Sequence, residues 1–161
     1  LFRIATFYFY DNFNIVLVNP QIPNNTGNIG RLCVGSLSTL HLVKPLGFEI
    51  TDSRVKRAGL DYWSDLDLTY HNNFKELLVS IPDMSRVFFF TTRAVQTYYD
   101  IDYQEGDWLV FGREADGLSE EIVNAYKTQC VKIPFPGTVR SFNLGNAVAM
   151  ALGEGLRQLG L

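Results

Sequence analysis

Short apolar runs that do not alternate with polar residues constrain the fold of this chain most strongly. Residues 15–18 (IVLV) and 108–111 (WLVF) carry apolar side chains at successive positions, and the segment 86–92 (RVFFFTT) does so over its centre, VFFF. A strand that is apolar on both faces is buried on both, so helices must cover each side of its sheet. Segments with helical spacing lie between the runs. The sequence therefore predicts an α/β fold with a mostly parallel sheet flanked by helices.

The predicted sheet has about six strands, connected by about six helices. Besides the three runs above, strands are expected at residues 40–43, 66–70 and 130–133. Helices are expected at residues 27–38, 53–60, 73–81, 119–126 and 143–159. Small polar residues precede several of them, and such residues cap helices. We expect Asn25 or Thr26 to cap the first helix and Asn72 or Asn73 to cap the third.

The chain is long enough for one domain. Its 161 residues fit a single hydrophobic core, and we place that domain at residues 14–161. Residues 1–13 (LFRIATFYFYDNF) are aromatic but lack the aliphatic stretch and cleavage site of a signal peptide, so we expect an N-terminal extension without a chemical role. No apolar run approaches the roughly 18 residues that cross a bilayer, so no membrane partner is expected.

Charge, cysteines and histidines narrow the function classes. Fourteen Lys and Arg against 17 Asp and Glu give a net charge of −3, which argues against nonspecific coating of nucleic acid but allows a local basic patch. Cys33 and Cys130 are too far apart for a CxxC motif, so we expect free, buried thiols and a cytoplasmic location. His41 and His71 stand alone in the sequence, so we expect structural roles and no metal site.

Three polar, glycine-containing segments each follow a predicted strand and lead into a helix. They are residues 19–31 (NPQIPNNTGNIGR), 112–118 (GREADGL) and 133–146 (IPFPGTVRSFNLGN). Ligands of parallel sheets bind beyond the carboxyl ends of the strands, where such segments converge. The chain has neither the G-x-G-x-x-G nor the G-x-x-x-x-G-K-[ST] motif, so dinucleotide binding and NTP hydrolysis are disfavoured.

The order and spacing of these segments resemble the SPOUT class of RNA methyltransferases, in particular the TrmL (YibK-like) tRNA (cytidine/uridine-34 2′-O)-methyltransferases. The similarity runs from residue 14 to the C-terminus and is carried by residues 19–33, 45–48 (PLGF), 57–62 (RAGLDY), 111–118 and 140–149 (RSFNLGNAVA). The resemblance implies a SPOUT fold with a deep trefoil knot in its C-terminal part. It also implies S-adenosylmethionine as cofactor, no metal, and a homodimer with each active site near the interface.

The resemblance assigns six residues to the cofactor. They are Phe90, Thr91, Gly112, Ile133, Ser141 and Leu144. Gly112 follows a buried strand, and the absence of a Cβ there is expected to let the cofactor approach the main chain closely.

Three further residues are assigned to catalysis by the same resemblance: Arg31, Glu114 and Asn143. A guanidinium is a poor proton acceptor near neutrality, so we expect Arg31 to hold a phosphate bidentately and to stabilise negative charge on the ribose oxygen. Glu114 is expected to orient loop amides or the surroundings of the cofactor. Asn143, or Ser141, is expected to cap the last helix while offering polar atoms to the ligand.

The implied substrate is the anticodon stem-loop of tRNA, methylated on the ribose of wobble nucleotide 34, a cytidine or a modified uridine. The cations expected to bind RNA are Arg31, Arg54, Lys56, Arg57, Arg93 and Arg140. Two alternatives remain open. One is the same chemistry at another tRNA position or on ribosomal RNA. The other is a catalytically idle RNA-binding dimer, which is disfavoured because the segments around Arg31 and Asn143 match the methyltransferase pattern.

Overall fold

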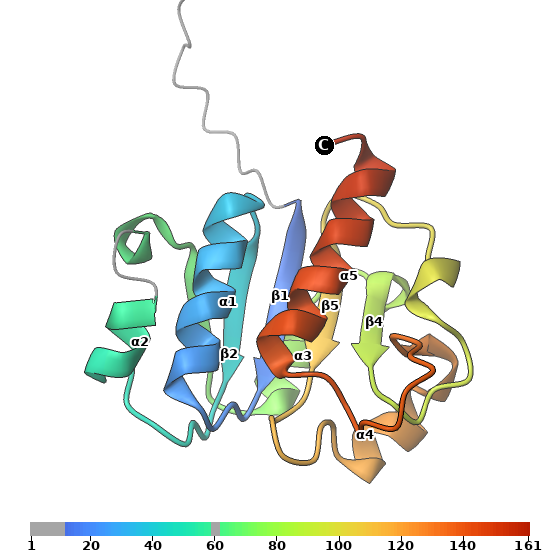
Figure 1. The fold of residues 1–161 in the computed structure, drawn as a ribbon, viewed down its shortest axis with the longest axis horizontal. Coiled ribbons are helices and arrows are strands. Elements are labelled where there is room, and N and C mark those ends of the chain that lie inside the picture. The colour runs from blue at the N-terminus through green and yellow to red at the C-terminus, as the bar shows by residue number, and fades with distance from the viewer. Residues whose placement is uncertain (1–11, 59–61) are drawn as a thin grey trace, which may run out of the picture.

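The computed structural model describes residues 12–58 and 62–161. Its centre is one sheet of six strands in the order β3-β2-β1-β5-β4-β6, and every neighbouring pair is parallel (Figure 1). The strands are β1 (Phe13–Val18), β2 (Thr39–Val43), β3 (Leu68–His71), β4 (Val87–Phe90), β5 (Asp107–Phe111) and β6 (Cys130–Val131). The predicted α/β fold is confirmed. The last strand is shorter than its apolar run predicted.

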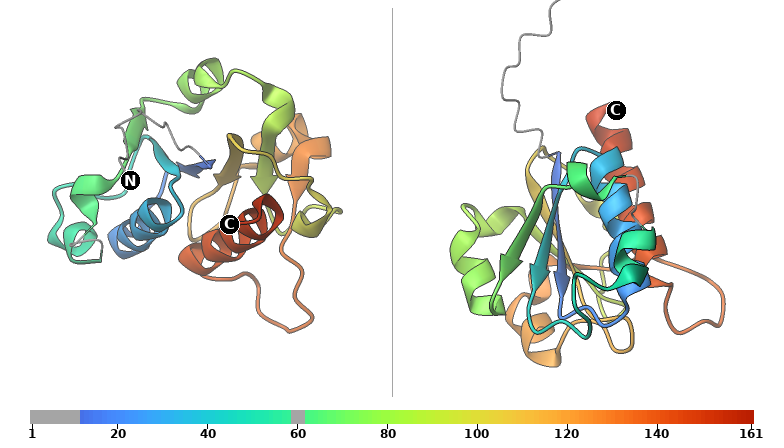
Figure 2. Two further views of the ribbon diagram at one scale, coloured as in Figure 1. Left: turned by 90° about the horizontal axis from the view of Figure 1, so that it is seen from above. Right: turned by 90° about the vertical axis from the view of Figure 1, so that its left-hand side faces the viewer.

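Helices cover both faces of the sheet. They are α1 (Pro23–Gly35), α2 (Ser53–Ala58), α3 (Phe74–Ser80), α4 (Glu120–Ala125) and α5 (Leu144–Leu159). Figure 2 shows α1 and α5 side by side on one face, with α3 and α4 on the other. The described residues thus hold five α-helices rather than about six. The remaining connections include short 3₁₀ turns, one of them at Trp63–Asp65 beside α1.

Two hydrophobic layers result from the two-sided burial of the strands. Along β1, Phe13, Ile15 and Leu17 join the layer beneath α1 and α5, whereas Val16 and Val18 join the layer beneath α3 and α4. All six positions of β1 are buried, which confirms the prediction for the apolar run at residues 15–18. The two free cysteines are buried, one in each layer, which confirms the expectation for both thiols.

The predicted caps at the helix N-termini are correct for α3 and wrong for α1. Asn73 caps α3, because its side chain accepts a hydrogen bond from the backbone N–H of Glu76. The prediction for α1 is wrong: the helix begins at Pro23, and no side chain caps it at Ile22. Proline suits the first helical position, because its fixed φ matches the helix and its missing N–H has no intrahelical partner there. Asn25 and Thr26 therefore lie inside the first turn.

The folded domain begins before residue 14. Phe13, assigned above to the extension, is the first residue of β1 and is fully buried. Its ring packs so closely on α5 that a Cβ on Gly155 would lie 2.6 Å from it. Phe13 therefore belongs to the core. The rest of the predicted extension, residues 1–11, lies outside the described residues.

The two histidines are adjacent rather than alone, which corrects the sequence-based view. His41 Nδ1 lies 3.0 Å from His71 Nε2, and His41 Nε2 lies 2.9 Å from Asn14 Oδ1. The Asn14 amide nitrogen donates to the Gly106 carbonyl, so its oxygen faces His41 and must accept. His41 therefore donates from Nε2 and accepts at Nδ1 from His71. Burial and the neighbouring His71 lower the pKa of His41 to about 3, so His41 is neutral.

Candidate active site

A cavity of about 440 Å³ opens at the carboxyl ends of β4, β5 and β6. Its walls come from the ends of these strands, the segment after β5 and the segment between β6 and α5. The six residues assigned to the cofactor all line it: Phe90, Thr91, Gly112, Ile133, Ser141 and Leu144. Residues as far apart as 90 and 144 are thus brought to one place, because parallel strands end at the same edge of the sheet.

Aromatic side chains form much of the wall, and three of the four, Phe111, Phe135 and Phe142, were not assigned to the site from the sequence. Phe90 stacks on Phe111 of the neighbouring strand, with ring centroids 4.6 Å apart. Phe135 and Phe142 meet edge to face at 4.8 Å within the segment between β6 and α5. All four rings line the cavity. Their position next to the ends of predicted strands was the sequence signal that could have assigned them to the site. An apolar slot of this kind suits a flat heterocycle.

The segment after β5 folds back on itself at Gly112. A Cβ on Gly112 would overlap the main-chain atoms of Gly117 and Leu118. Gly117 has a φ of +69°, and Arg113 pairs with it in an antiparallel bridge. The space beside Gly112 is thus filled by the chain itself. This corrects the expectation that a ligand uses that space, although Gly112 still lines the cavity.

Three arginines hold the returning segment, residues 112–118. Arg93, which follows β4, donates to the Leu118 carbonyl, and Arg140 donates to the Ala115 carbonyl at 2.9 Å. Arg113 forms an ion pair with Asp116 and lowers the pKa of that carboxyl. Arg93 and Arg140 were assigned to RNA. In the structure both line the cavity, and each joins one of its walls to residues 112–118.

Glu114 ties the same segment to the start of α1. Its two carboxylate oxygens accept hydrogen bonds from the backbone N–H groups of Gln21, at 2.8 Å, and Ile22, at 3.0 Å. The free N–H groups at a helix start need acceptors, and a negative charge there is stabilising. Glu114 thus orients loop amides, one of the two roles expected for it. This contact makes it a positioning residue.

Asn143 makes the second connection between the cavity and α1. Its side-chain nitrogen donates to Asn25 Oδ1 at 3.1 Å, while its oxygen accepts from the backbone N–H of Asn146 at 3.2 Å. The second bond caps α5 as predicted. The first fixes the start of α5, where Leu144 lines the cavity, against the first turn of α1.

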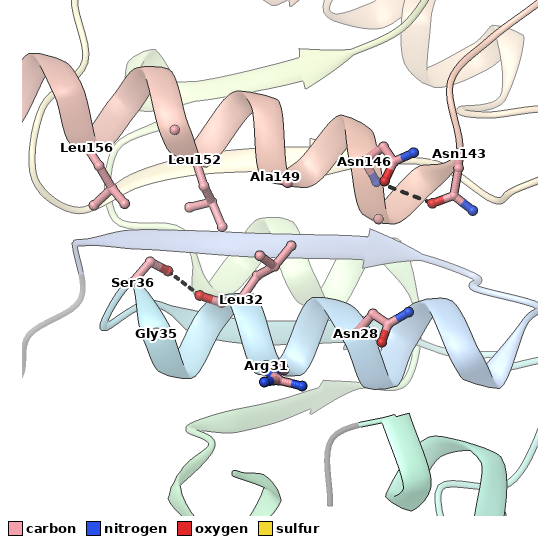
Figure 3. A pocket seen from close by; sticks show the side chains of 12 residues that line it. Asn28, Arg31, Leu32, Gly35, Ser36, Asn143, Asn146, Ala149, Leu152 and Leu156 are labelled. Atoms are coloured by element: carbon pink, nitrogen blue, oxygen red, sulfur yellow. Dashed lines mark hydrogen bonds between the residues drawn. The ribbon is translucent and has the colours of Figure 1, made fainter. Parts of the chain in front are cut away.

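Arg31 does not line the cavity. It lies at the edge of a separate groove of about 620 Å³ between α1 and α5, lined also by Leu32, Leu152 and Leu156. Figure 3 shows the three leucines between the helices and Arg31 on the side of α1 away from α5. Among the described residues, Arg31 has no hydrogen bond and no ion pair, and its guanidinium lies over the ring of Tyr62. Within one chain, Arg31 is thus separate from the cavity lined by the residues assigned to the cofactor.

The predicted basic patch is likewise divided. Arg54 and Arg57 are exposed on α2, which packs beside α1, whereas Arg93 and Arg140 lie at the cavity. Asp52 forms an ion pair with Arg54 at 3.0 Å. Arg57 has no such partner among the described residues, and the side chain of Lys56 is outside the description. Two clusters of cations therefore replace the one expected patch.

The described ranges, 12–58 and 62–161, hold neither a metal-binding cluster nor a helix that could span a membrane. No three His, Cys, Asp or Glu side chains there lie close enough together to hold a metal ion. Within the same ranges, no helix has the length and apolar character needed to cross a membrane.

The fold and its cavity place the chain in the class of RNA methyltransferases. A solved structure described as "Structural insights into the 2-OH methylation of C/U34 on tRNA" superposes with a TM-score of 0.87 at 44% identity, covering 92% of this chain and 96% of that one. An AdoMet-bound rRNA methyltransferase from Sinorhizobium meliloti shares the fold, with a TM-score of 0.80 at 22% identity over 92% of this chain and 57% of that one.

The chain belongs to the SpoU rRNA Methylase family, whose sequence model matches residues 12–153. A tRNA (cytidine(34)-2′-O)-methyltransferase from Burkholderia pseudomallei is 42% identical over 150 residues, covering 92% of this chain and 96% of the relative. One of the same name from Acidovorax is 44% identical over 148 residues, covering 91% of each. The predicted family is confirmed. The trefoil knot stays a prediction.

Proposed function

We propose that this chain transfers the methyl group of S-adenosylmethionine to the ribose 2′-oxygen of wobble nucleotide 34, a cytidine or a modified uridine, in the anticodon stem-loop of tRNA. One observation carries the proposal. All six residues assigned to the cofactor line one cavity at the carboxyl ends of three parallel strands. The relatives that are 42% and 44% identical over most of their length bear the name of this activity.

The cavity fits the cofactor in size and chemistry. Its volume of about 440 Å³ lies in the range of small-molecule sites. Phe90 and Ile133 offer apolar walls to an adenine ring, while Thr91 and Ser141 offer hydroxyl groups. When bound, S-adenosylmethionine supplies a methyl group on a positively charged sulfur. The chain's residues must hold that group in line with the attacking oxygen at about 3–3.5 Å.

Arg31 is the residue we assign to the acceptor. None of the described residues accepts a hydrogen bond from its N–H groups, so none of them competes with an RNA phosphate for these donors. A bidentate contact fixes the phosphate next to the reacting ribose, and the positive charge stabilises negative charge on the 2′-oxygen. The guanidinium is too weak a base to take the hydroxyl proton, which leaves to phosphate or water. Glu114 and Asn143 act by holding α1 against the cavity.

We further propose that two copies of the chain form the active enzyme in the cytoplasm. The groove between α1 and α5 is lined by the half-buried Leu32 and Leu156, beside Gly35 and Gly153, where a Cβ would meet no atom within 4 Å. Such a surface lets a second copy approach closely. Because Arg31 and the cavity are separate within one chain, an interface here supports a site assembled from both copies. The free, buried thiols of Cys33 and Cys130 support a reducing compartment.

Transfer of radiolabelled methyl from S-adenosylmethionine to total tRNA, followed by mapping of the modified ribose, tests the proposal. We expect label on nucleotide 34 and a large loss of transfer for Arg31→Lys, because a point charge lacks the planar fork. Label at another tRNA position, or on ribosomal RNA, would favour the first alternative. Binding of tRNA without transfer would favour the idle dimer. Sedimentation of the purified protein tests the proposed homodimer separately, since a monomer at micromolar concentration would contradict it.

A further inference from the structure

Hydrogen bonds hold most of the described arginines in place, and Arg31 is an exception. Arg86, Arg93, Arg113, Arg140 and Arg157 each donate hydrogen bonds to a carboxylate or a carbonyl. Arg31 has no such partner among the described residues. Instead, its guanidinium carbon lies 4.9 Å from the centroid of the Tyr62 ring, within the range of a cation–π contact.

The placement of Tyr62 follows from its neighbour in the chain. Trp63 packs its ring against α1 at Gly30, where a Cβ would lie 3.1 Å from the Trp63 ring. The absence of a side chain at Gly30 therefore lets Trp63 approach the helix. Gly30 precedes Arg31, and Tyr62 precedes Trp63. The contact between Gly30 and Trp63 therefore fixes the distance between Arg31 and Tyr62, and the Tyr62 ring is held against the Arg31 guanidinium.

An aromatic ring restrains a guanidinium without using its N–H groups. The ring interacts with the positive charge through its face, while hydrogen bonds leave from the edges of the planar group. A carboxylate partner would restrain Arg31 equally well but would occupy two of its donors. A ring therefore suits an arginine that must be ordered yet ready to receive an anion. Tyr62 is 38% exposed, so the contact lies at a surface that RNA can reach.

We propose that Tyr62 is a positioning residue for the methyl transfer, acting through Arg31. Its ring holds the guanidinium with its donors free for the phosphate beside the reacting ribose. This inference rests on the proposed function, since it assigns Arg31 to the RNA backbone. The face of the ring carries the effect, so the Tyr62 hydroxyl is dispensable.

Steady-state transfer of labelled methyl to tRNA tests the role of the ring with two variants. We expect Tyr62→Leu to lower kcat/KM for tRNA by about two- to fivefold, the loss expected for an exposed cation–π contact, with the KM for S-adenosylmethionine unchanged. Tyr62→Phe should retain wild-type kcat/KM, because phenylalanine keeps the ring face. In an Arg31→Ala background, Tyr62→Leu should cause no further loss, since the residue that it positions is gone.

Tyr70→Leu is the matched control. Tyr70 is 40% exposed and lies 5.3 Å from the ammonium group of Lys44, a cation to which we assign no role in the reaction. It should keep wild-type kcat/KM. The inference is overturned if Tyr62→Leu is as active as wild type, if Tyr62→Phe loses as much as Tyr62→Leu, or if the loss persists without Arg31. Absence of transfer by the wild-type protein would instead refute the proposed function.

Discussion

Replacing Glu114 by glutamine tests whether one carboxylate joins the cavity to α1. Both of its oxygens accept backbone N–H groups, from Gln21 and Ile22. Glutamine keeps one acceptor and turns an NH₂ group toward the other N–H, so one hydrogen bond is lost and two donors face each other. The change also removes a negative charge from the start of a helix that has no side-chain cap of its own.

The size of the effect follows from these contacts. A hydrogen bond to a charged group contributes about 1.5–3 kcal/mol. The charge at the helix start adds about 0.3–1 kcal/mol. Because Glu114 is only partly buried, water can replace part of both contributions, and we take the lower end. We expect the free energy of unfolding to fall by about 1.5–2 kcal/mol, which lowers the Tm of a domain of this size by about 3–8 °C.

Two measurements on the same protein check this prediction. Thermal or urea unfolding gives the stability change, and calorimetry gives the affinity for S-adenosylmethionine, which should decrease because Glu114 also lines the cavity. Glu105→Gln is the control, since Glu105 is exposed and makes no hydrogen bond or ion pair with the described residues. If Glu114→Gln unfolds and binds the cofactor like Glu105→Gln, the carboxylate does not anchor α1 and our account of this connection is wrong.

Three other predictions concern packing and pH. In Gly112→Ala, the new Cβ would overlap Gly117, so we expect calorimetry to detect no cofactor binding; normal binding would contradict the account of this turn. Stability should decrease as the pH falls from about 6.5 towards 3, because the unfolded chain protonates His41 in that window while the folded chain, with a pKa of about 3, does not. Equal urea midpoints at pH 7.5 and 5.0 would refute this. Gly155→Ala forces a Cβ toward Phe13 at 2.6 Å and should lower the free energy of unfolding by about 1–3 kcal/mol, measured by urea titration.

Local patterns were sufficient to predict the sheet and several helix starts. Four successive apolar residues, as in β1, have few other environments than the middle of a covered sheet. Asn73 and Asn143 cap their helices through side chains that reach backbone amides three residues later. Information of this kind lies within a few neighbouring residues, so one sequence contains it.

Contacts between segments that are far apart in the sequence could not be predicted from such local patterns. The start of α1 receives its acceptor from Glu114, more than 90 residues away, so the neighbouring residues wrongly indicated Asn25 or Thr26 as the cap. Glycine is required at position 112 because the main chain folds back against it, and the sequence does not reveal that contact. The separation of Arg31 from the cavity depends on how α1 and α5 lie across the sheet. The resemblance assigned the site residues without showing this arrangement.

The two strands at the margins of the sheet, β3 and β6, are only four and two residues long. Main-chain groups at such margins are where amyloid growth and strand exchange begin, and short margins are a common protection against both. A foreign strand would find too few partners here for a lasting ladder. Pairing of strands across these margins is therefore a poor route for joining two copies of the chain, whereas the helical layers offer side chains for burial.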